Sequence, residues 1–358
     1  MITGDVRPYL EGKKSPVKLG KDEFSFSVMC LDHGHIYGMT DALSRAGATL
    51  RYVYDSDIKK AEAFKKAFPQ AVLARCEEEV LSDDKTLLIA GAAVTSRRCE
   101  LGIKAMKAGK DYFTDKAPFT ELSQLEEARK AIKETGRRYM VYYSERLHAE
   151  SAVLAGYMIE QGKIGRVLSV NGFGPHRLSP KDRPEWFFKK KEYGGILCDI
   201  GSHQIEQYLF FAGEDDAEVV SSRVANYAHP DYPELEDYGD CMITGKNGTS
   251  NYFRVDWFTP DGLRTWGDGR TFILGTEGYI EIRKYIDIAH GNVVKDRVFL
   301  VNGKGEQCFD AEGKTGFPFF NGFLLDLINR TENAMTQEHA LKAAELCLKA
   351  EASAVNIG

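Results

Sequence analysis

Residues 24–55 read FSFSVMCLDHGHIYGMTDALSRAGATLRYVYD. The apolar run at 24–30 predicts a strand, the apolar spacing through Ala46 predicts a helix, and the run at 49–54 predicts a second strand. Two strands joined by a helix within about thirty residues are the unit from which parallel α/β sheets are built. This stretch therefore predicts a parallel sheet at the start of the fold.

The same alternation of strands and helices continues as far as Tyr143. Further strands are expected at 71–74, 86–90, 111–114 and 138–143, and further helices at 58–68, 98–108 and 122–134. Six strands separated by helices indicate an α/β, Rossmann-type, doubly wound parallel sheet. We expect residues 24–147 to form this dinucleotide-binding domain, after an N-terminal arm of residues 1–23.

The turn after the first strand is where such a sheet binds its ligand. It contains Gly34 and Gly38 beside a helix N-terminus that can face a pyrophosphate, although Asp32 stands where the first glycine of the usual motif is expected. Asp55 ends the second strand, where a carboxylate binds the ribose hydroxyls of NAD and repels the 2′-phosphate of NADP. The sequence therefore predicts NAD in preference to NADP.

Two histidines, His33 and His35, flank Gly34 in this turn. No further ligands at a suitable spacing accompany them, so no metal site is expected. Contact with the cofactor phosphates or with the floor of the pocket is one interpretation, and a purely structural role is the other.

The pattern changes after residue 147 and predicts a second, α+β domain over residues 148–358. Six successive runs separated by short turns indicate a large, mostly antiparallel open sheet. The expected elements are helices at 148–161, 196–211, 319–335 and 339–355, strands at 165–171, 218–226, 238–244, 249–258, 271–274, 279–283 and 297–301, and polar, aromatic loops at 174–178 and 183–188. We expect the two last helices to be able to pack back on the first domain.

Residues 194–203, GGILCDIGSH, carry two polar residues in an otherwise apolar helical pattern. Asp199 and His203 are four residues apart, which predicts that they share one face of the helix. A histidine is suited to proton transfer near neutral pH, and a carboxylate can orient it. A satisfied structural pair is the alternative, but Lys116 follows the fifth strand, where a nucleotide-binding domain would present it to a ligand.

Together, the sequence DKAP at 115–118 and the Gly-Gly…Asp…His pattern ending at His203 resemble signatures of the Gfo/Idh/MocA family of nicotinamide-dependent oxidoreductases. The family's Glu-Lys-Pro is similar to 115–118, with Asp for Glu and an inserted alanine, and its Ala-Gly-Lys run is similar to 108–110. The chain departs from the family at 94–95, where Val-Thr replaces Pro-Asn, and at Arg98, which replaces a histidine.

The resemblance implies hydride transfer between NAD and a secondary alcohol of a sugar, a polyol or a related cyclic substrate. It implies catalytic roles for Lys116 and His203, with Asp199 in support. Physical reasoning agrees, because His203 can accept the hydroxyl proton while Lys116 stabilises the developing alkoxide. The residues expected to bind the cofactor are Asp32, His33, Gly34, His35, Ile36, Asp55, Val94, Thr95, Asp115 and Lys116.

Substrate contacts are expected from segments that should approach the cleft between the two domains: Arg146, His176, Arg177 and Trp186. Plain core packing is the alternative for 186–188. The resemblance also implies a homodimer or homotetramer formed through the second sheet. Two other functions stay open: a redox-neutral, NAD-dependent glycosidase or lyase, and a non-catalytic dinucleotide-binding sensor.

Composition narrows the function classes. The 358 residues carry a formal charge of −6, which argues against nucleic acid or an anionic membrane as partner. No apolar run reaches the length of a membrane span, and the first 22 residues lack the apolar region of a secretory signal. Seven scattered cysteines without a C-x-x-C pair favour a reducing compartment, so we expect a cytoplasmic protein.

Overall fold

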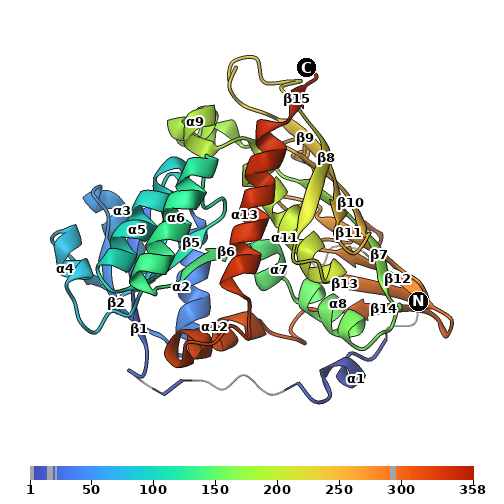
Figure 1. The fold of residues 1–358 in the computed structure, drawn as a ribbon, viewed down its shortest axis with the longest axis horizontal. Helices are drawn as coiled ribbons and strands as arrows, with labels where there is room; N and C mark the ends of the chain where they lie inside the picture. The colour runs from blue at the N-terminus through green and yellow to red at the C-terminus, as the bar shows by residue number, and fades with distance from the viewer. Residues whose placement is uncertain (1–3, 14–18, 21, 291–295) are drawn as a thin grey trace.

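The computed structural model describes residues 4–13, 19–20, 22–290 and 296–358. Two sheets stand side by side, and a layer of helices separates them (Figure 1). The first sheet belongs to the N-terminal part of the chain and the second to the C-terminal part. The elements that position the candidate site all lie along the boundary between these two parts.

The first sheet has six strands in the order β3-β2-β1-β4-β5-β6, and all neighbours are parallel. This confirms the predicted Rossmann-type sheet. The strand order reverses between β1 and β4, the switch point at which sheets of this kind bind ligand. The bounds are β1 Ser25–Leu31, β2 Thr49–Tyr54, β3 Val72–Leu73, β4 Leu88–Ala92, β5 Asp111–Asp115 and β6 Tyr139–Tyr142.

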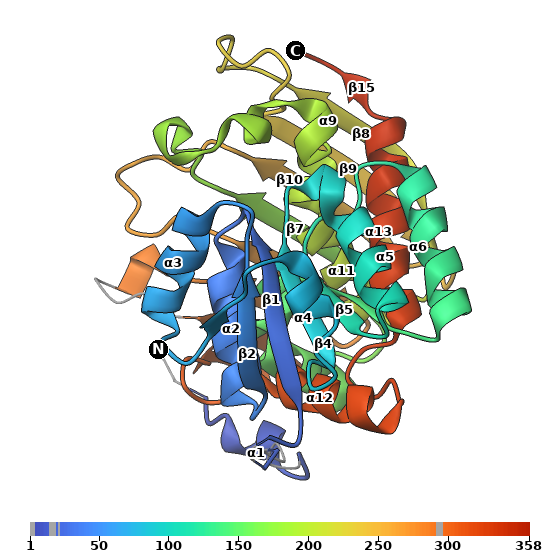
Figure 2. The same ribbon diagram turned by 90° about the vertical axis from the view of Figure 1, so that its left-hand side faces the viewer.

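The predicted fourth strand at 86–90 is two residues early, because the fully buried run is 88–92. Right-handed crossovers place α2 on the face of the sheet opposite to α5 and α6. Figure 2 shows α3 on one side of this view and α5 and α6 on the other. The helices are α2 His35–Arg45, α3 Ile58–Ala67, α4 Glu77–Leu81, α5 Arg98–Lys107 and α6 Leu122–Thr135.

The second sheet has nine strands in the order β14-β13-β12-β11-β7-β10-β9-β8-β15. Its neighbours are antiparallel except for the pairs β7–β10 and β8–β15, so the expected mostly antiparallel sheet is confirmed. The bounds are β7 Val167–Pro175, β8 Ala217–Ala225, β9 Tyr238–Gly245, β10 Ser250–Asp256, β11 Arg270–Gly275, β12 Gly278–Arg283, β13 Arg297–Asn302, β14 Gly305–Asp310 and β15 Val355–Asn356.

Helices cover one face of the second sheet and leave the other face open (Figure 1). The helix α11 packs on β7 and β10, α13 packs on β8, and α8 packs on β12 and β13. The bounds are α7 Ser144–Leu147, α8 Glu150–Glu160, α9 Lys190–Tyr193, α10 Ile196–Asp199, α11 Gly201–Ala212, α12 Pro318–Asn329 and α13 Gln337–Ala352.

The last two helices also contact the first sheet's layer. The ring of Phe323 in α12 lies 4.9 Å from that of Phe113 in β5, and α13 packs against α6 and β6. The predicted helix at 319–335 was too long. It ends at Asn329 because the carboxylate of Asp326 accepts hydrogen bonds from the backbone N–H groups of Asn333 (2.9 Å) and Ala334 (2.7 Å), which turns the chain.

The predicted helix at 196–211 was wrong in one respect, because it is interrupted at Ile200. The Ser202 hydroxyl donates to the carbonyl oxygen of Asp199 at 2.8 Å and competes with the helical hydrogen bond there. The N–H of His203 binds the carbonyl of Ile200 at 3.1 Å, a bond across three residues. Asp199 and His203 therefore belong to two successive short helices.

The strand β7 runs to Pro175, so the loop predicted at 174–178 begins two residues too early. The reason is close packing: a Cβ on Gly172 would lie 2.1 Å from Oε1 of Gln204 in α11. The glycines let α11 approach the strand, and the strand continues where turn residues suggested a loop.

Of the N-terminal residues that the structure describes, 4–13 lie against the second sheet and α8, whereas Leu19 and Asp22 lie near the start of β2. The helix α1, Arg7–Leu10, places Tyr9 with its ring centroid 5.3 Å from that of Phe309 in β14. Residues 1–3, 14–18 and 21 of the predicted arm lie outside the described residues. Among the described helices, none is long and apolar enough to cross a membrane.

Candidate active site

Lys116 and Asp199 form a buried ion pair between the two parts of the chain. Lys116 follows β5 at the carboxyl edge of the first sheet, and Asp199 ends α10. Burial alone raises the pKa of Asp199, but the Lys116 ammonium more than offsets this and the pKa falls to about 2. The second carboxylate oxygen, Oδ2, is buried without a hydrogen-bond partner in the described structure, so it is free to accept one.

His203 is buried beside this pair with only 2% of its surface exposed. Burial lowers its pKa to about 3, although the nearby Glu145 opposes the shift. The imidazole is therefore neutral at pH 7, and within the described residues its Nδ1 has no hydrogen-bond partner. Asp199 binds Lys116 and not His203, so the expected orientation of the histidine by that carboxylate is not what the geometry shows.

A second buried ion pair, Glu145–Lys284, was missed by the sequence reasoning. The Lys284 Nζ lies 2.9 Å from Oε2 of Glu145, and both side chains are at most 2% exposed. Gln204 donates to the same oxygen at 3.1 Å, whereas Oε1 has no hydrogen bond among the described residues. Burial raises the pKa of Glu145, but Lys284 and the neighbouring histidines hold it well below its usual range. Its place directly after β6, at the carboxyl edge of a parallel sheet, was the available signal.

His33 and His35 meet at the carboxylate of Asp115. The His35 Nδ1 donates to Oδ1 at 2.8 Å, and the His33 Nδ1 lies 2.7 Å from Oδ2. These ligand atoms all lie within 4.8 Å of one another, an arrangement that a metal ion can use. The carboxylate also accepts from the Lys116 backbone N–H at 2.8 Å and from Arg98 at 3.2 Å. Because Asp115 already accepts from His35, from the Lys116 backbone N–H and from the Arg98 guanidinium, the geometry favours a hydrogen-bond centre over a cation site.

Arg98, which stands where the family has a histidine, fixes the loop that carries Lys116. It is 1% exposed and donates to the carbonyl oxygens of Ala93 (2.7 Å) and Ala117 (3.0 Å) and to that of Lys116. Through these hydrogen bonds, Arg98 connects the end of β4 to the end of β5.

The turn after β1 holds the other residues expected to bind a cofactor. Asp32 is paired with Lys60 and accepts from the Val94 backbone N–H at 3.1 Å, so its charge is offset. Asp55 accepts from the backbone N–H groups of Leu31 (2.7 Å) and Asp57 (2.8 Å). Asp32, Asp55 and Val94 line a cavity of about 180 Å³ at the carboxyl edge of the sheet.

The remaining residues of that prediction contribute in different ways. Gly34 precedes α2, and no other atom lies within 4 Å of the point where a side chain on it would begin, so the helix start is open. Ile36 is fully buried in the core and can offer only its backbone. Thr95 is buried at the first residue of a short helical turn, 95–97.

The four residues expected to contact substrate do not come together. His176 lies at the site: burial lowers its pKa to about 4, and Glu145, Lys116 and Asp199 all act on it. Arg177 binds the carbonyl oxygens of Pro260 (2.8 Å) and Leu263 (2.6 Å) and so holds a loop. Trp186 packs against Phe187, with ring centroids 5.8 Å apart.

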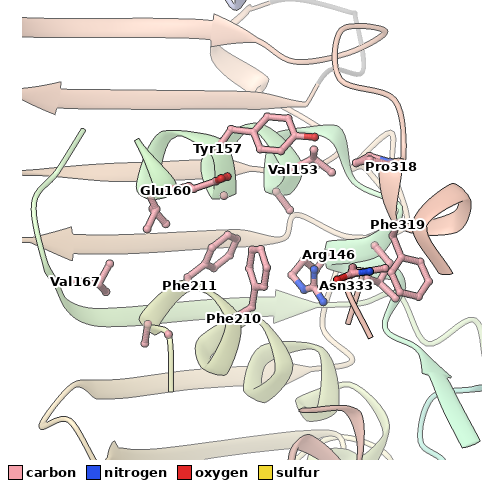
Figure 3. A pocket seen from close by; sticks show the side chains of 18 of the residues that line it. Arg146, Val153, Tyr157, Glu160, Val167, Phe210, Phe211, Pro318, Phe319 and Asn333 are labelled. Carbon is pink, nitrogen blue, oxygen red and sulfur yellow. The ribbon is translucent and has the colours of Figure 1, made fainter. Parts of the chain in front are cut away.

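Arg146 lines a different cavity (Figure 3). This cavity, of about 760 Å³, is lined mainly by apolar side chains, including Phe210, Phe211 and Phe319. Arg146 pairs there with the buried Glu206 and lies under the ring of Phe210 at 4.0 Å. None of Lys116, Asp199 and His203 lines it.

Comparison with known proteins identifies the class. Residues 34–143 match the oxidoreductase family with an NAD-binding Rossmann fold (GFO_IDH_MocA), and residues 154–281 match the GFO/IDH/MocA C-terminal domain. A crystal structure from Erwinia carotovora atroseptica, of a protein classed only in general terms as an oxidoreductase, is 49% identical, with a TM-score of 0.91 over 94% of this chain and 100% of that one.

More distant relatives have more specific names. A scyllo-inositol 2-dehydrogenase (NAD⁺) of Bacillus subtilis is 26% identical over 82% of this chain and 81% of its own length. A D-xylose dehydrogenase of Paenarthrobacter nicotinovorans is 30% identical, but the match spans only 34% of its length. A levoglucosan dehydrogenase solved with NADH and levoglucosan shares the fold, with a TM-score of 0.76 at 16% identity over 92% of this chain and 97% of that one.

The fold and the site define an oxidoreductase with an NAD(P)-binding Rossmann domain. More particularly, the chain belongs to the Gfo/Idh/MocA family, as its signatures predicted.

Proposed function

We propose that this protein transfers hydride between NAD and a secondary alcohol of a sugar, a polyol or a related cyclic substrate. The observation that carries the proposal is the meeting of the Lys116–Asp199 ion pair with the neutral imidazole of His203 at the carboxyl edge of the dinucleotide-binding sheet. Such an edge presents a substrate to a bound dinucleotide.

The residues of the first turn fit the dinucleotide. The open start of α2 at Gly34 can receive a phosphate, and the negative charge of Asp32 is offset by Lys60. Asp55 faces the cavity at the end of β2, where its carboxylate supports NAD over NADP. When bound, NAD supplies the acceptor for the hydride.

The chain's own side chains supply the proton chemistry. The Lys116 ammonium donates to the substrate oxygen and stabilises negative charge as it develops there. His203, kept neutral by burial, accepts the proton of this reacting hydroxyl, and the unpartnered oxygen of Asp199 accepts a hydrogen bond from a neighbouring hydroxyl of the substrate. Burial of all three excludes bulk water from this transfer.

The test is a kinetic comparison of Lys116→Ala and His203→Ala with the unmodified protein, following the absorbance of reduced nicotinamide with a panel of sugars, inositols and sugar acids. Both variants should lose turnover by roughly 100-fold or more while still binding NAD. Lys130→Ala, on the exposed surface of α6, is the matched control. Full turnover in both variants would refute the assignment, and product formation without reduced cofactor would favour the redox-neutral reaction.

We also propose the division of the chain at residues 147 and 148, a cytoplasmic location, and assembly into a homodimer or homotetramer through the open face of the second sheet. Large apolar side chains are exposed on strands of that sheet, including Val220 (60%), Met242 (49%) and Leu274 (40%). Size-exclusion chromatography with light scattering tests the assembly, and a monomer would refute it.

A further inference from the structure

Arg183 is a cation near the Lys116–Asp199 pair that lacks an ion-pair partner in the described part of the chain. Its one hydrogen bond there runs from Nε to the carbonyl oxygen of Leu178 at 3.0 Å. The half-buried guanidinium lies close enough to Asp199 for each to influence the pKa of the other, and the adjacent, exposed Asp182 acts on it as well. Four N–H donors, on Nη1 and Nη2, are left without a hydrogen bond among these residues.

Two aromatic rings fix the plane of this guanidinium. Its central carbon lies 4.6 Å from the ring centroid of Phe187 and 5.0 Å from that of Trp257. The two rings are themselves in edge-to-face contact at 5.3 Å. A guanidinium held in this way presents a preorganised fork of donors, which matches the two oxygens of a carboxylate.

Trp257 adds a second donor at the same place. It is 4% exposed, and its Nε1–H is buried without an acceptor among the described residues. A buried N–H without an acceptor is destabilising unless a ligand satisfies it. Two neighbouring donors without acceptors therefore indicate an acceptor-rich, anionic group.

The other end of the site has the opposite character. Asp199 Oδ2, Glu145 Oε1 and His203 Nδ1 are buried atoms without hydrogen bonds in the described structure, and the two oxygens can only accept. His176 connects the two ends, with its ring 5.6 Å from that of Trp257 and its Nε2 3.8 Å from Glu145. Acceptors at this end suit the hydroxyl groups of a substrate.

Three other cations near the site have ion-pair partners among the described residues. Lys116 is paired with Asp199, Lys284 with Glu145, and Arg98 with Asp115. Arg183 has no such ion-pair partner in the described part of the chain, so a neutral sugar would leave this half-buried guanidinium without a direct counter-ion. A bound anion would compensate it.

We propose that the substrate is a polyhydroxy carboxylic acid, a sugar acid, whose carboxylate binds Arg183 and the Trp257 N–H while its hydroxyl groups face Asp199, Glu145 and His203. This assignment deepens the proposed function and rests on it for the identity of the reacting alcohol. The recognition of the carboxylate is a separate property and can be measured without turnover.

The experiment compares matched substrates that differ by a carboxylate: D-glucose with D-glucuronate, D-galactose with D-galacturonate, and D-glucitol with D-gluconate. With NAD, kcat/KM should be at least 10-fold higher for the acid of one pair. Arg183→Met should lower that value by roughly 10- to 100-fold, mainly through KM, and should lower kcat/KM for the neutral partner by a much smaller factor. Lys181→Met removes an exposed charge from the same loop and should have no such effect.

Calorimetric titration of the same acids, with NADH present to prevent turnover, separates the two proposals. Acid binding that Arg183→Met weakens by the same factor and Arg183→Lys partly restores supports the assignment, even if no substrate is oxidised. In that case only the proposed dehydrogenase reaction fails. Three results would overturn the carboxylate assignment: equal use of acids and neutral partners, acid binding that Arg183→Met does not change, or no binding of any acid. Thermal unfolding of each variant checks that the fold is intact.

Discussion

Replacing Lys284 by methionine should destabilise the protein strongly, because it leaves the carboxylate of Glu145 buried without its counter-ion. Lys284 is fully buried, and Glu145 is 1% exposed. Breaking such a pair from one side costs roughly 3–5 kcal/mol of unfolding free energy, since the remaining charge cannot reach water. The unfolding free energy from urea titration at pH 7 is the measurement.

The pH dependence of this loss follows from the pKa of Glu145. In the unmodified protein Lys284 holds that pKa below its usual range, so the pair stabilises the fold above about pH 4.5 and less so in acid. In Lys284→Met the largest influence that lowers this pKa is lost, so burial raises the pKa of Glu145 relative to that in the unmodified protein. The variant should therefore lose most stability at neutral pH and recover part of it toward pH 4.5, where the carboxyl group takes up a proton.

Two further variants make the prediction specific. Glu145→Gln combined with Lys284→Met should be more stable than Lys284→Met alone, because the uncompensated charge is gone. Lys130→Met breaks an exposed pair with Glu134 and should change stability by less than about 0.5 kcal/mol. A loss below about 1 kcal/mol in Lys284→Met, or a loss that is the same at pH 5 and pH 8, would refute the reasoning.

Three other predictions concern stability. Burial lowers the pKa of His176 to about 4 and that of His203 to about 3, so the unfolded chain binds more protons than the folded protein below pH 6.5. Calorimetry should therefore show the melting temperature falling from pH 6.5 to pH 4. A constant melting temperature would contradict this. Burial raises the pKa of Glu351 to about 8, so the contribution of this residue to stability should fall as the pH rises from 4.5 through 8. Glu351→Gln should remove this pH dependence from the unfolding free energies measured by urea titration. Gly102→Ala would bring a Cβ to 2.3 Å from the buried Tyr139 ring and should cost about 1–3 kcal/mol in urea unfolding, whereas an unchanged value would show that the ring can move.

Much of the fold could be predicted because both sheets have strong local patterns. Strands such as 49–54 are bounded as expected, since turn residues and apolar runs coincide there. The strand β14 was not predicted: its residues, GEQCFD, are mostly polar, and it pairs at the edge of the sheet with β13. Edge strands have little apolar patterning to read, because much of their surface faces water.

The candidate site could be predicted only where it coincides with a sequence signature. Lys116, Asp199 and His203 lie in such segments, but Glu145, Lys284 and Arg183 do not. Lys284 follows β12, and its contact with Glu145 depends on how the second sheet meets the end of β6. Pairings between residues 139 positions apart arise from tertiary structure, and local spacing carries no signal for them.

The ion pair of Asp199 with Lys116 changes how the proposed roles are divided among the candidate catalytic groups. Asp199 binds Lys116 and not His203, and both Asp199 Oδ2 and His203 Nδ1 are without hydrogen-bond partners among the described residues. In the proposed reaction the reacting hydroxyl accepts from Lys116 and a neighbouring hydroxyl donates to Asp199, which satisfies both members of that pair without separating them. Because burial lowers the pKa of His203 to about 3, its imidazole is neutral near pH 7 and can accept the hydroxyl proton in the proposed reaction.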